Sequence, residues 1–350
     1  MEASVTQGPS TYSNGAVAPH AASRAGRTMR AMINDAYGSP DLLQVREIVR
    51  PTVDDDGVLV RVRAAGLHVG DCFVVRGAPL LMRTATGLFK PKYGVPGFDV
   101  AGQVEAVGKN VKRFQPGDEV FGACEGSCAE YARTKESHLA LKPTNLTLEE
   151  SAALPTSALA ALHGLRDAGK LRAGQKVLIN GASGGVGTFA VQIARALGAE
   201  VTGVCSSANV DLVRSLGADH VIDYTREDFT RLGPRYDLVF DNIENRTLSE
   251  CRRALTPGGT LVLNSGTGAR GIKMLVRLLK PLLVSPFVRQ NLRRYLSMPN
   301  HQDLVVLKEL VESGKLKPVV DRTYQLGETS EALRYIEGGH ARGKVVVTLP

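Results

Sequence analysis

Seven residues in the middle of the chain, Gly181–Gly187 with the sequence GASGGVG, constrain the fold more than any other feature. An apolar run at 176–180 comes directly before them, a helical pattern follows over 188–197, and a second apolar run occupies 201–204. A glycine-rich turn between a strand and a helix lets backbone approach a phosphate, and the helix N-terminus supplies N–H donors. This order predicts a βαβ unit that binds a dinucleotide.

Five residues of this turn are candidates for contact with the phosphates of the dinucleotide. Gly184 lets the backbone approach a pyrophosphate, and Gly187 lets the following helix pack closely on the strand before it. Ala182 stands where the commonest form of the pattern has glycine, a departure that a tight turn tolerates. We therefore predict cofactor contacts from Ser183, Gly184, Gly185, Val186 and Gly187.

The pattern after residue 150 is typical of a parallel, doubly wound sheet, because apolar runs alternate with helical stretches. Further runs of this kind are found at 220–222, 236–240 and 260–263. Before residue 150, short alternating runs such as 58–62 and 102–107 are separated by glycine and proline, which indicates strands and turns. The chain thus combines an α/β domain with a β-rich domain, to which a last strand at 344–348 returns.

Residues 1–28 are rich in Ser, Ala, Gly and Pro and lack the apolar core of a secretory signal, so we expect a disordered tail. Arginines in and just after this stretch leave an organelle-transit sequence as the alternative. No apolar run in the chain approaches the ~20 residues of a membrane-spanning helix. Five cysteines are scattered without a CxxC spacing, which favours reduced thiols and a cytoplasmic location.

Positive charge is concentrated in one segment. The formal net charge is +8, and residues 271–300 contain six basic residues and no acidic one. Leucine, valine and phenylalanine separate these charges, so the segment is unlike a phosphate-tracking stripe and we expect no nucleic-acid partner. We interpret it in three ways: as a cover over a substrate cleft, as an interface of a homodimer, or, least favoured, as an element that attaches to a membrane surface.

The residues after the second strand of the βαβ unit bear on the choice of dinucleotide. A site that selects NAD usually has Asp or Glu there to bind the ribose 2′-hydroxyl, whereas this chain has Cys205, Ser206 and Ser207. A carboxylate would repel a 2′-phosphate, and small hydroxyls can donate hydrogen bonds to it. The sequence therefore favours NADPH.

Several further motifs occur in a fixed order along the chain. They are AAGLHVGD at 64–71, GFDVAG at 97–102, PGDEVFG at 116–122, ALP at 153–155 and GGHARGK at 338–344. In these motifs and in the glycine turn, the chain from about Met29 to Pro350 resembles the medium-chain dehydrogenase/reductase superfamily, and within it the zeta-crystallin-like quinone oxidoreductases.

The resemblance implies a Rossmann domain inserted in a GroES-like catalytic domain, and commonly a homodimer or homotetramer. It divides the chain into four parts. These are the tail at 1–28, the first part of the catalytic domain at 29–155, the Rossmann domain at 156–297, and the return to the catalytic domain at 298–350.

The zinc alcohol dehydrogenases of this superfamily carry a cysteine ligand where this chain has His68, and a histidine ligand where it has Phe98. Their further cysteine ligand falls near Leu154 or Pro155. His68 and Asp99 have donor atoms, but two ligands do not close a tetrahedral zinc site. We therefore expect no metal.

Three residues are candidates for the substrate site. His68 occupies the position where quinone oxidoreductases carry Asn near the nicotinamide, and its imidazole either donates a hydrogen bond or proton to substrate or makes a structural hydrogen bond. Asp71 either orients His68 or caps a helix. Tyr93 either lines the cleft or packs within a loop.

The resemblance also assigns residues to the adenosine-phosphate end of the cofactor. Ser206, Ser207 and Tyr224 take these positions, and Lys344 approaches the cofactor from the final strand. Ala160 stands where the family has a threonine near the nicotinamide.

Together these features predict an NADPH-dependent reductase that transfers hydride, without a metal, to a quinone or an α,β-unsaturated carbonyl. The expected substrate is a small hydrophobic electrophile. Two alternatives remain: an alcohol or ketone oxidoreductase, and a non-catalytic NADPH-binding partner protein, because a fold does not guarantee turnover.

Overall fold

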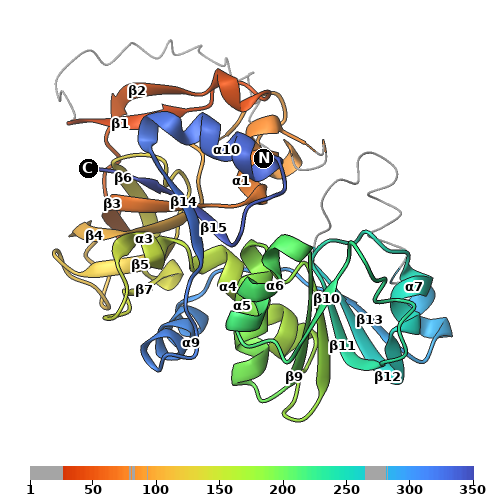
Figure 1. The fold of residues 1–350 in the computed structure, drawn as a ribbon. Coiled ribbons are helices and arrows are strands. Elements are labelled where there is room, and N and C mark those ends of the chain that lie inside the picture. The colour runs from red at the N-terminus through yellow and green to blue at the C-terminus, as the bar shows by residue number, and fades with distance from the viewer. Residues whose placement is uncertain (1–26, 79, 81–82, 93, 265–280, 282) are drawn as a thin grey trace, which may run out of the picture.

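The computed structural model describes residues 27–78, 80, 83–92, 94–264, 281 and 283–350. The chain forms two lobes, one around a seven-stranded sheet and the other around a six-stranded parallel sheet (Figure 1). Almost all of the predicted tail lies outside the described residues. No helix in the described part of the chain is long and apolar enough to cross a membrane.

The seven-stranded sheet forms the β-rich lobe, and its hydrogen-bonded path has the order β14-β15-β3-β4-β5-β7, with β6 paired to β3. The predicted runs at 58–62 and 102–107 lie in β3 and β4. The strands are β3 (Gly57–Leu67), β4 (Asp99–Val107), β5 (Glu119–Ala123), β6 (Tyr131–Lys135), β7 (Leu139–Leu141), β14 (Val320–Gln325) and β15 (Lys344–Thr348). The predicted last strand, β15, pairs antiparallel with β3, so the C-terminus returns to the first lobe. A separate two-stranded sheet pairs β1 (Thr28–Ile33) with β2 (Gln44–Val49).

The six-stranded sheet is parallel throughout and has the order β10-β9-β8-β11-β12-β13. Its first five strands in the chain coincide with the five predicted apolar runs, so the doubly wound sheet is confirmed. They are β8 (Lys176–Asn180), β9 (Glu200–Cys205), β10 (His220–Asp223), β11 (Tyr236–Asp241) and β12 (Leu255–Leu263), and the sixth is β13 (Asn291–Arg294).

Helices connect and cover the two sheets. They are α1 (Val69–Arg76), α2 (Arg83–Thr86), α3 (Leu148–Ala152), α4 (Pro155–Leu162), α5 (Gly185–Ala196), α6 (Val210–Ser215), α7 (Leu248–Arg253), α9 (His301–Glu312) and α10 (Thr329–Glu337), with a π-helical turn η4 (His163–Ala168) after α4. Short 3₁₀ turns are η1 (Pro40–Leu42), η3 (Glu136–His138), η5 (Ser207–Asn209), η6 (Ser285–Phe287) and η7 (Leu326–Glu328).

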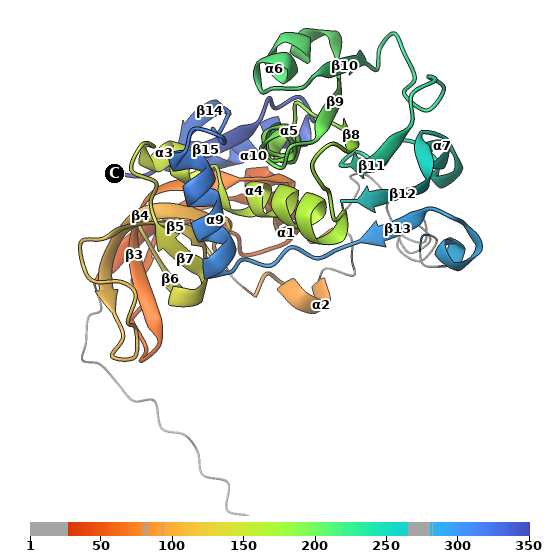
Figure 2. The same cartoon turned by 90° about the horizontal axis from the view of Figure 1, so that it is seen from below.

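Helix α4 lies between the lobes and joins their cores. It packs against α5 of the Rossmann lobe and against β4, β5 and α9 (Figure 2). One buried cluster accordingly includes Phe121 of β5, Leu159 of α4 and Phe240 of β11. Burial of such side chains contributes about 1.5–3 kcal/mol each, so the two lobes are held by a shared apolar core.

The basic segment 271–300 lies only partly within the described residues. Residues 271–280 and 282 fall outside them, so this part of the segment interpreted as a cover, a dimer interface or a membrane element is not described. In the described part, Asn291–Arg294 forms β13 at the edge of the six-stranded sheet. A strand of this length with alternating exposure gives no apolar run in the sequence, and it was therefore not predicted.

Candidate functional site

The glycine turn lies between β8 and α5, as predicted. Gly181 has φ +81°, a conformation that favours glycine. A β-carbon at Gly187 would lie 2.0 Å from the carbonyl oxygen of Gly181, so close packing requires glycine there. Helix α5 begins at Gly185, three residues before the predicted start, because the last glycines of the turn already have helical geometry.

The N-terminus of α5 fits a phosphate group. Its N-cap residue is Gly184, which has no side chain that could accept a hydrogen bond from the first turn. A β-carbon at Gly184 would meet only the Gly181 carbonyl oxygen, at 3.5 Å, so the backbone there is open to an approaching ligand. The first-turn N–H groups and the positive end of the helix dipole can therefore hold a pyrophosphate.

Asn209 joins the glycine turn to the end of β9. Its side-chain amide nitrogen donates to Ser183 Oγ at 3.1 Å and to Ser206 Oγ at 3.2 Å. The structure thus brings two of the predicted cofactor residues together. Asn209 itself was not identified from the sequence, because no cofactor motif includes it.

Ser207, Tyr224 and the carboxylate of Asp223 lie at the carboxyl ends of β9 and β10. Ser207 Oγ donates to Asp223 Oδ2 at 2.5 Å and lies 3.0 Å from Thr225 Oγ1. The Ser207 hydroxyl, followed by hydrogen bonds from Thr225, lowers the pKa of Asp223. Tyr224 follows directly and is 53% exposed, which leaves its ring free to contact an adenosine group.

The Cys205 side chain lies in the core, although it occupies the sequence position where NAD-selective sites have Asp or Glu. Its side chain is 1% exposed and belongs to the apolar core below the sheet, and burial raises the pKa of its thiol to about 11. The residue after it, Ser206, is the first at the end of β9 whose side chain reaches the partly exposed crevice. Of these three residues, only Ser206 and Ser207 have side chains outside the core at the end of β9, so they and not Cys205 are the candidates for contact with the dinucleotide there.

Lys344 lies beneath the glycine turn and is almost completely buried. Its ammonium lies 3.3 Å from Asp99 Oδ2 and donates to Ser157 Oγ at 3.1 Å. A β-carbon at Gly185 would be 3.5 Å from Lys344 Cδ, so the lysine stem touches the first turn of α5. Lys344 therefore lies near the glycine turn with Asp99 as its counter-ion, and its contact with the cofactor stays a prediction.

His68 is the N-cap residue of α1. Its Nδ1 accepts a hydrogen bond from the backbone N–H of Gly70 at 2.9 Å, so in the neutral ring the proton is on Nε2. Nε2 is buried and has no hydrogen-bond partner among the described residues. The ring stacks on Phe98, with centroids 5.8 Å apart. The site therefore contains a buried N–H donor that no described protein group satisfies.

Asp71 completes the cap of α1. Its Oδ2 accepts from the backbone N–H of His68 at 2.8 Å and lies 3.6 Å from His68 Nδ1. Burial raises the pKa of the Asp71 carboxyl. Because its side chain is fully buried, Asp71 holds His68 in place and does not face the cleft.

One predicted site residue is not described, and one pair of residues at the site was not predicted. Tyr93 lies outside the described residues. A pair that the sequence analysis missed, Asn180 and Asp241, joins the carboxyl ends of β8 and β11 through a hydrogen bond of 2.8 Å. Each of these residues ends an apolar run, and that position is the signal that would have identified them.

The donor set around His68 does not fit a zinc ion. The His68 imidazole stacks on the hydrocarbon face of Phe98, which offers no metal ligand. The Asp99 carboxylate is already bound by Lys344 and by Thr156. In the described ranges, no group of three or more His, Cys, Asp or Glu side chains is placed to hold a metal.

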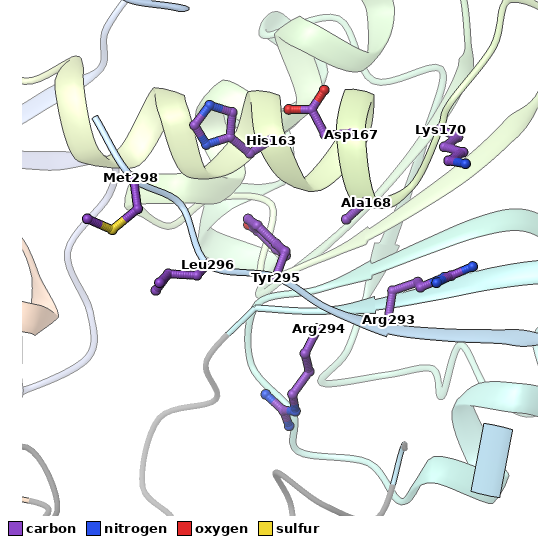
Figure 3. Close-up of a pocket in the computed structure, with 9 residues that line it drawn as sticks. All are labelled: His163, Asp167, Ala168, Lys170, Arg293, Arg294, Tyr295, Leu296 and Met298. Atoms are coloured by element: carbon purple, nitrogen blue, oxygen red, sulfur yellow. The ribbon is translucent and has the colours of Figure 1, made fainter. Parts of the chain in front are cut away.

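A separate hollow of about 450 Å³ lies between the η4 turn and β13 (Figure 3). Its walls include Tyr295, Leu296 and Met298 near one end, with Lys170 and Arg293 at the other. Neither the predicted cofactor residues nor His68 and Asp71 line it, and its only link to the predictions is that Arg293 to Met298 belong to the basic segment 271–300, so we do not assign it to the active site.

Comparison with known proteins gives consistent matches in both lobes. Residues 54–163 match the alcohol dehydrogenase GroES-like domain, and residues 216–347 match a family described as zinc-binding dehydrogenase. The chain is 33% identical to 2-methylene-furan-3-one reductase of Solanum lycopersicum, over 91% of this chain and 79% of that protein. It is 34% identical to the chloroplastic NADPH-dependent alkenal/one oxidoreductase of Arabidopsis thaliana, over 92% and 80%.

A solved structure agrees with these matches. The quinone oxidoreductase from Coxiella burnetii superposes with a TM-score of 0.80 at 27% identity, over 93% of this chain and 100% of that one. The fold, the glycine turn and the relatives lead to one assignment. The chain belongs to the medium-chain dehydrogenase/reductase family of oxidoreductases, with a GroES-like domain and a Rossmann domain.

Proposed function

We propose that the protein is an NADPH-dependent reductase of quinones or α,β-unsaturated carbonyls. The observation that carries this proposal is the buried Nε2–H of His68, which has no hydrogen-bond partner in the part of the chain that the structure describes and is a donor suited to a substrate oxygen that becomes negative. Two relatives support it, since their names describe reduction of a methylene-furanone and of alkenals or alkenones.

The glycine turn and the adenosine crevice are the residues that would hold the cofactor, and NADPH bound there supplies a hydride. A conjugated carbonyl accepts hydride at carbon, so negative charge moves to its oxygen. His68 Nε2–H then donates a hydrogen bond to that oxygen. Because Nδ1 already accepts from Gly70, the neutral ring donates a hydrogen bond and keeps its proton, and water protonates the substrate carbon.

Reduction of simple ketones requires stronger stabilisation of the substrate oxygen than reduction of enones. Reduction of an isolated carbonyl requires greater polarisation of its oxygen than one neutral imidazole donor gives. Enones spread the developing charge over three atoms and need less. The donor set thus favours conjugated substrates over ketones and alcohols.

A substrate panel with NADPH tests the proposal. Consumption of NADPH with small enones and quinones, at rates well above those with unconjugated ketones, is the expected result. Activity restricted to ketones would contradict the proposal and favour an alcohol or ketone oxidoreductase. A rise in melting temperature with saturating NADPH but no turnover of any electrophile would favour a cofactor-binding partner protein instead.

We also propose that the reaction needs no metal. The support is the chemistry around His68, where Phe98 and the Lys344-paired Asp99 leave too few donors for a tetrahedral site. Purified protein should contain no stoichiometric zinc and should keep its activity in a chelator. Elemental analysis that finds about one zinc per chain, with activity lost on its removal, would contradict this.

A homodimer is the third part of the proposal. Strand β13 is the last strand of the six-stranded sheet, and the residues after it include Leu296, 82% exposed, and Met298, 60% exposed. An open strand edge beside exposed apolar side chains suits pairing with a second copy. Light scattering should give twice the chain mass, and Leu296→Ser/Met298→Ser should shift the protein toward the monomer. A parent protein that scatters as a single chain would contradict the dimer.

A further inference from the structure

The tip formed by residues 86–92 exposes two large apolar side chains side by side. Leu88 is 60% exposed and Phe89 is 89% exposed, whereas Pro91 in the same tip is buried. A scattered apolar residue on a surface needs no explanation, but an adjacent Leu–Phe pair at a projecting turn does.

The tip is held in place rather than loosely attached. Tyr37 Oη donates to the Gly87 carbonyl at 2.6 Å, and the Lys92 N–H donates to the Thr86 carbonyl at 2.6 Å, which closes the turn. Arg83 stacks over the Tyr37 ring at 4.5 Å and donates to the Gly77 carbonyl. These contacts keep Leu88 and Phe89 directed outward even though their burial would be favourable.

The chain segment that contains the tip carries charge of one sign, although Arg76 within it is paired with Glu337. Residues 72–98 contain four basic residues and no acidic one, and Lys90 and Lys92 flank the exposed pair. Both lysines are exposed. An apolar point with cations at its base is the pattern of a peripheral element that inserts between lipid headgroups, and each such cation adds attraction to anionic lipid.

Size argues against a protein partner. A stable protein interface needs about 800 Å² on each side, and the tip, unlike the β13 edge, has no strand that could add backbone pairing to its two exposed side chains. Insertion into a bilayer needs only a small apolar tip.

The tip is also connected to the active site. The chain leaves the site in α1, whose N-cap is His68, and returns to it at Phe98, whose ring stacks on that of His68. The tip therefore lies on the chain segment whose two ends meet at the stacked pair of His68 and Phe98.

We propose that the 86–92 tip docks the protein on a lipid surface with anionic headgroups. Leu88 and Phe89 enter the boundary of the acyl chains, and Lys90 lies among the headgroups. The further consequence, that membrane-dissolved quinones or long-chain enones reach the cleft from the bilayer, rests on the proposed function. Docking itself does not.

Sedimentation with vesicles tests the docking without any substrate. The full-length protein should bind vesicles of phosphatidylcholine with phosphatidylglycerol, bind phosphatidylcholine alone much more weakly, and lose binding at high salt. Leu88→Ser/Phe89→Ser should weaken binding at least tenfold, and Lys90→Gln should weaken it severalfold. Absence of vesicle binding by the parent protein, or binding that the tip variants leave unchanged, would overturn the proposal.

Matched variants control for general surface effects. Val49→Ser removes an exposed apolar side chain on β2, and Lys109→Gln removes an exposed lysine on a distant turn. Neither should change vesicle binding, and an equal loss in these variants would refute a specific role for the tip.

A kinetic measurement separates docking from a lid over the substrate. With a small soluble enone and no vesicles, the tip variants should keep the parent KM. A raised KM with unchanged vesicle binding would identify a lid and overturn docking. Because sedimentation needs no turnover, a protein that docks but reduces no electrophile would refute the proposed function alone.

Discussion

The Lys344 ammonium lies 3.3 Å from the Asp99 carboxylate, and both side chains are almost completely buried. The pair joins β15 at the C-terminal end of the chain to β4. Thr156 donates to the other oxygen of Asp99 through its backbone N–H at 2.9 Å, so the carboxylate also caps the first turn of α4. One ion pair thus connects the sheet of the catalytic lobe to the helix that enters the Rossmann lobe.

Removal of one partner should destabilise the fold strongly. Asp99→Asn leaves the Lys344 ammonium buried without a counter-charge, a change that costs about 3–5 kcal/mol. The double variant Asp99→Asn/Lys344→Met should recover much of this loss, because it removes both charges. Urea unfolding measures each variant. The exposed pair Lys109–Asp55 serves as the control, since Asp55→Asn should cost less than about 1 kcal/mol. Equal losses for Asp99→Asn and Asp55→Asn would contradict the prediction.

The donor role of His68 predicts a graded set of rates. His68→Ala removes the Nε2–H and should lower kcat for enones by about 10²-fold, the usual effect of losing one oxyanion donor. His68→Asn keeps a side-chain N–H and a good N-cap residue, so its kcat should stay within about tenfold of the parent value. NADPH affinity should change little in both variants. If steady-state kinetics give His68→Ala an undiminished kcat, His68 is only a structural cap.

Much of the fold could be predicted because its signals are local. The apolar runs that became β8, β9, β11 and β12 are buried on both sides of the sheet, so their residues are almost uniformly apolar. Strand β13 has the sequence NLRR and only one buried residue, which leaves no pattern to detect. Local sequence also places the glycine turn correctly, because strand, turn and helix are consecutive.

The remaining parts of the site depend on contacts between distant residues. Asp99 and Lys344 are 245 positions apart, and their pairing follows from the return of β15 to β3 and not from any motif. The burial of Cys205 depends on which face its side chain takes at the last position of β9. An alignment of motifs shows that Cys205 ends the strand but not on which face of the sheet its side chain lies.

Because Cys205 is buried, the test of cofactor selection should change Ser206 instead. Ser206→Asp places a carboxylate in the crevice beside Asn209 and should weaken NADPH binding at least tenfold while NADH binding changes little. Ser206→Asn, of similar size and without charge, is the control. Cys205→Asp would instead bury a charge in the core and should lower the free energy of unfolding rather than switch the cofactor. Fluorescence titration of the parent protein and of each variant with NADPH and with NADH measures these affinities. Unchanged NADPH affinity in Ser206→Asp would show that the 2′-phosphate lies elsewhere.

Asp303 joins the two chain segments that pass between the lobes, and its charge should make stability depend on pH. It accepts hydrogen bonds from His163 at 2.9 Å, Arg166 at 2.7 Å and Asn300 at 2.7 Å. Burial alone would raise the pKa of its carboxyl, but the bonds from Arg166, Asn300 and His163 outweigh it and hold that pKa well below its usual range.

A carboxyl whose pKa is lowered by folding stabilises the protein above the unfolded pKa, about 3.9, and this contribution is lost as pH falls toward the folded value. At pH 7, Asp303→Asn should therefore cost on the order of 2 kcal/mol, because it weakens hydrogen bonds to a charged group. Below about pH 4 the difference between variant and parent should shrink, since the parent carboxylate loses its advantage as it approaches protonation. Urea unfolding between neutral and acid pH measures the free energy of unfolding of the parent and of each variant. The control Asp55→Asn should differ from the parent by a small amount that does not shrink at low pH. A constant penalty for Asp303→Asn from neutral to acid pH would mean that packing, and not the charge of Asp303, holds the two segments together.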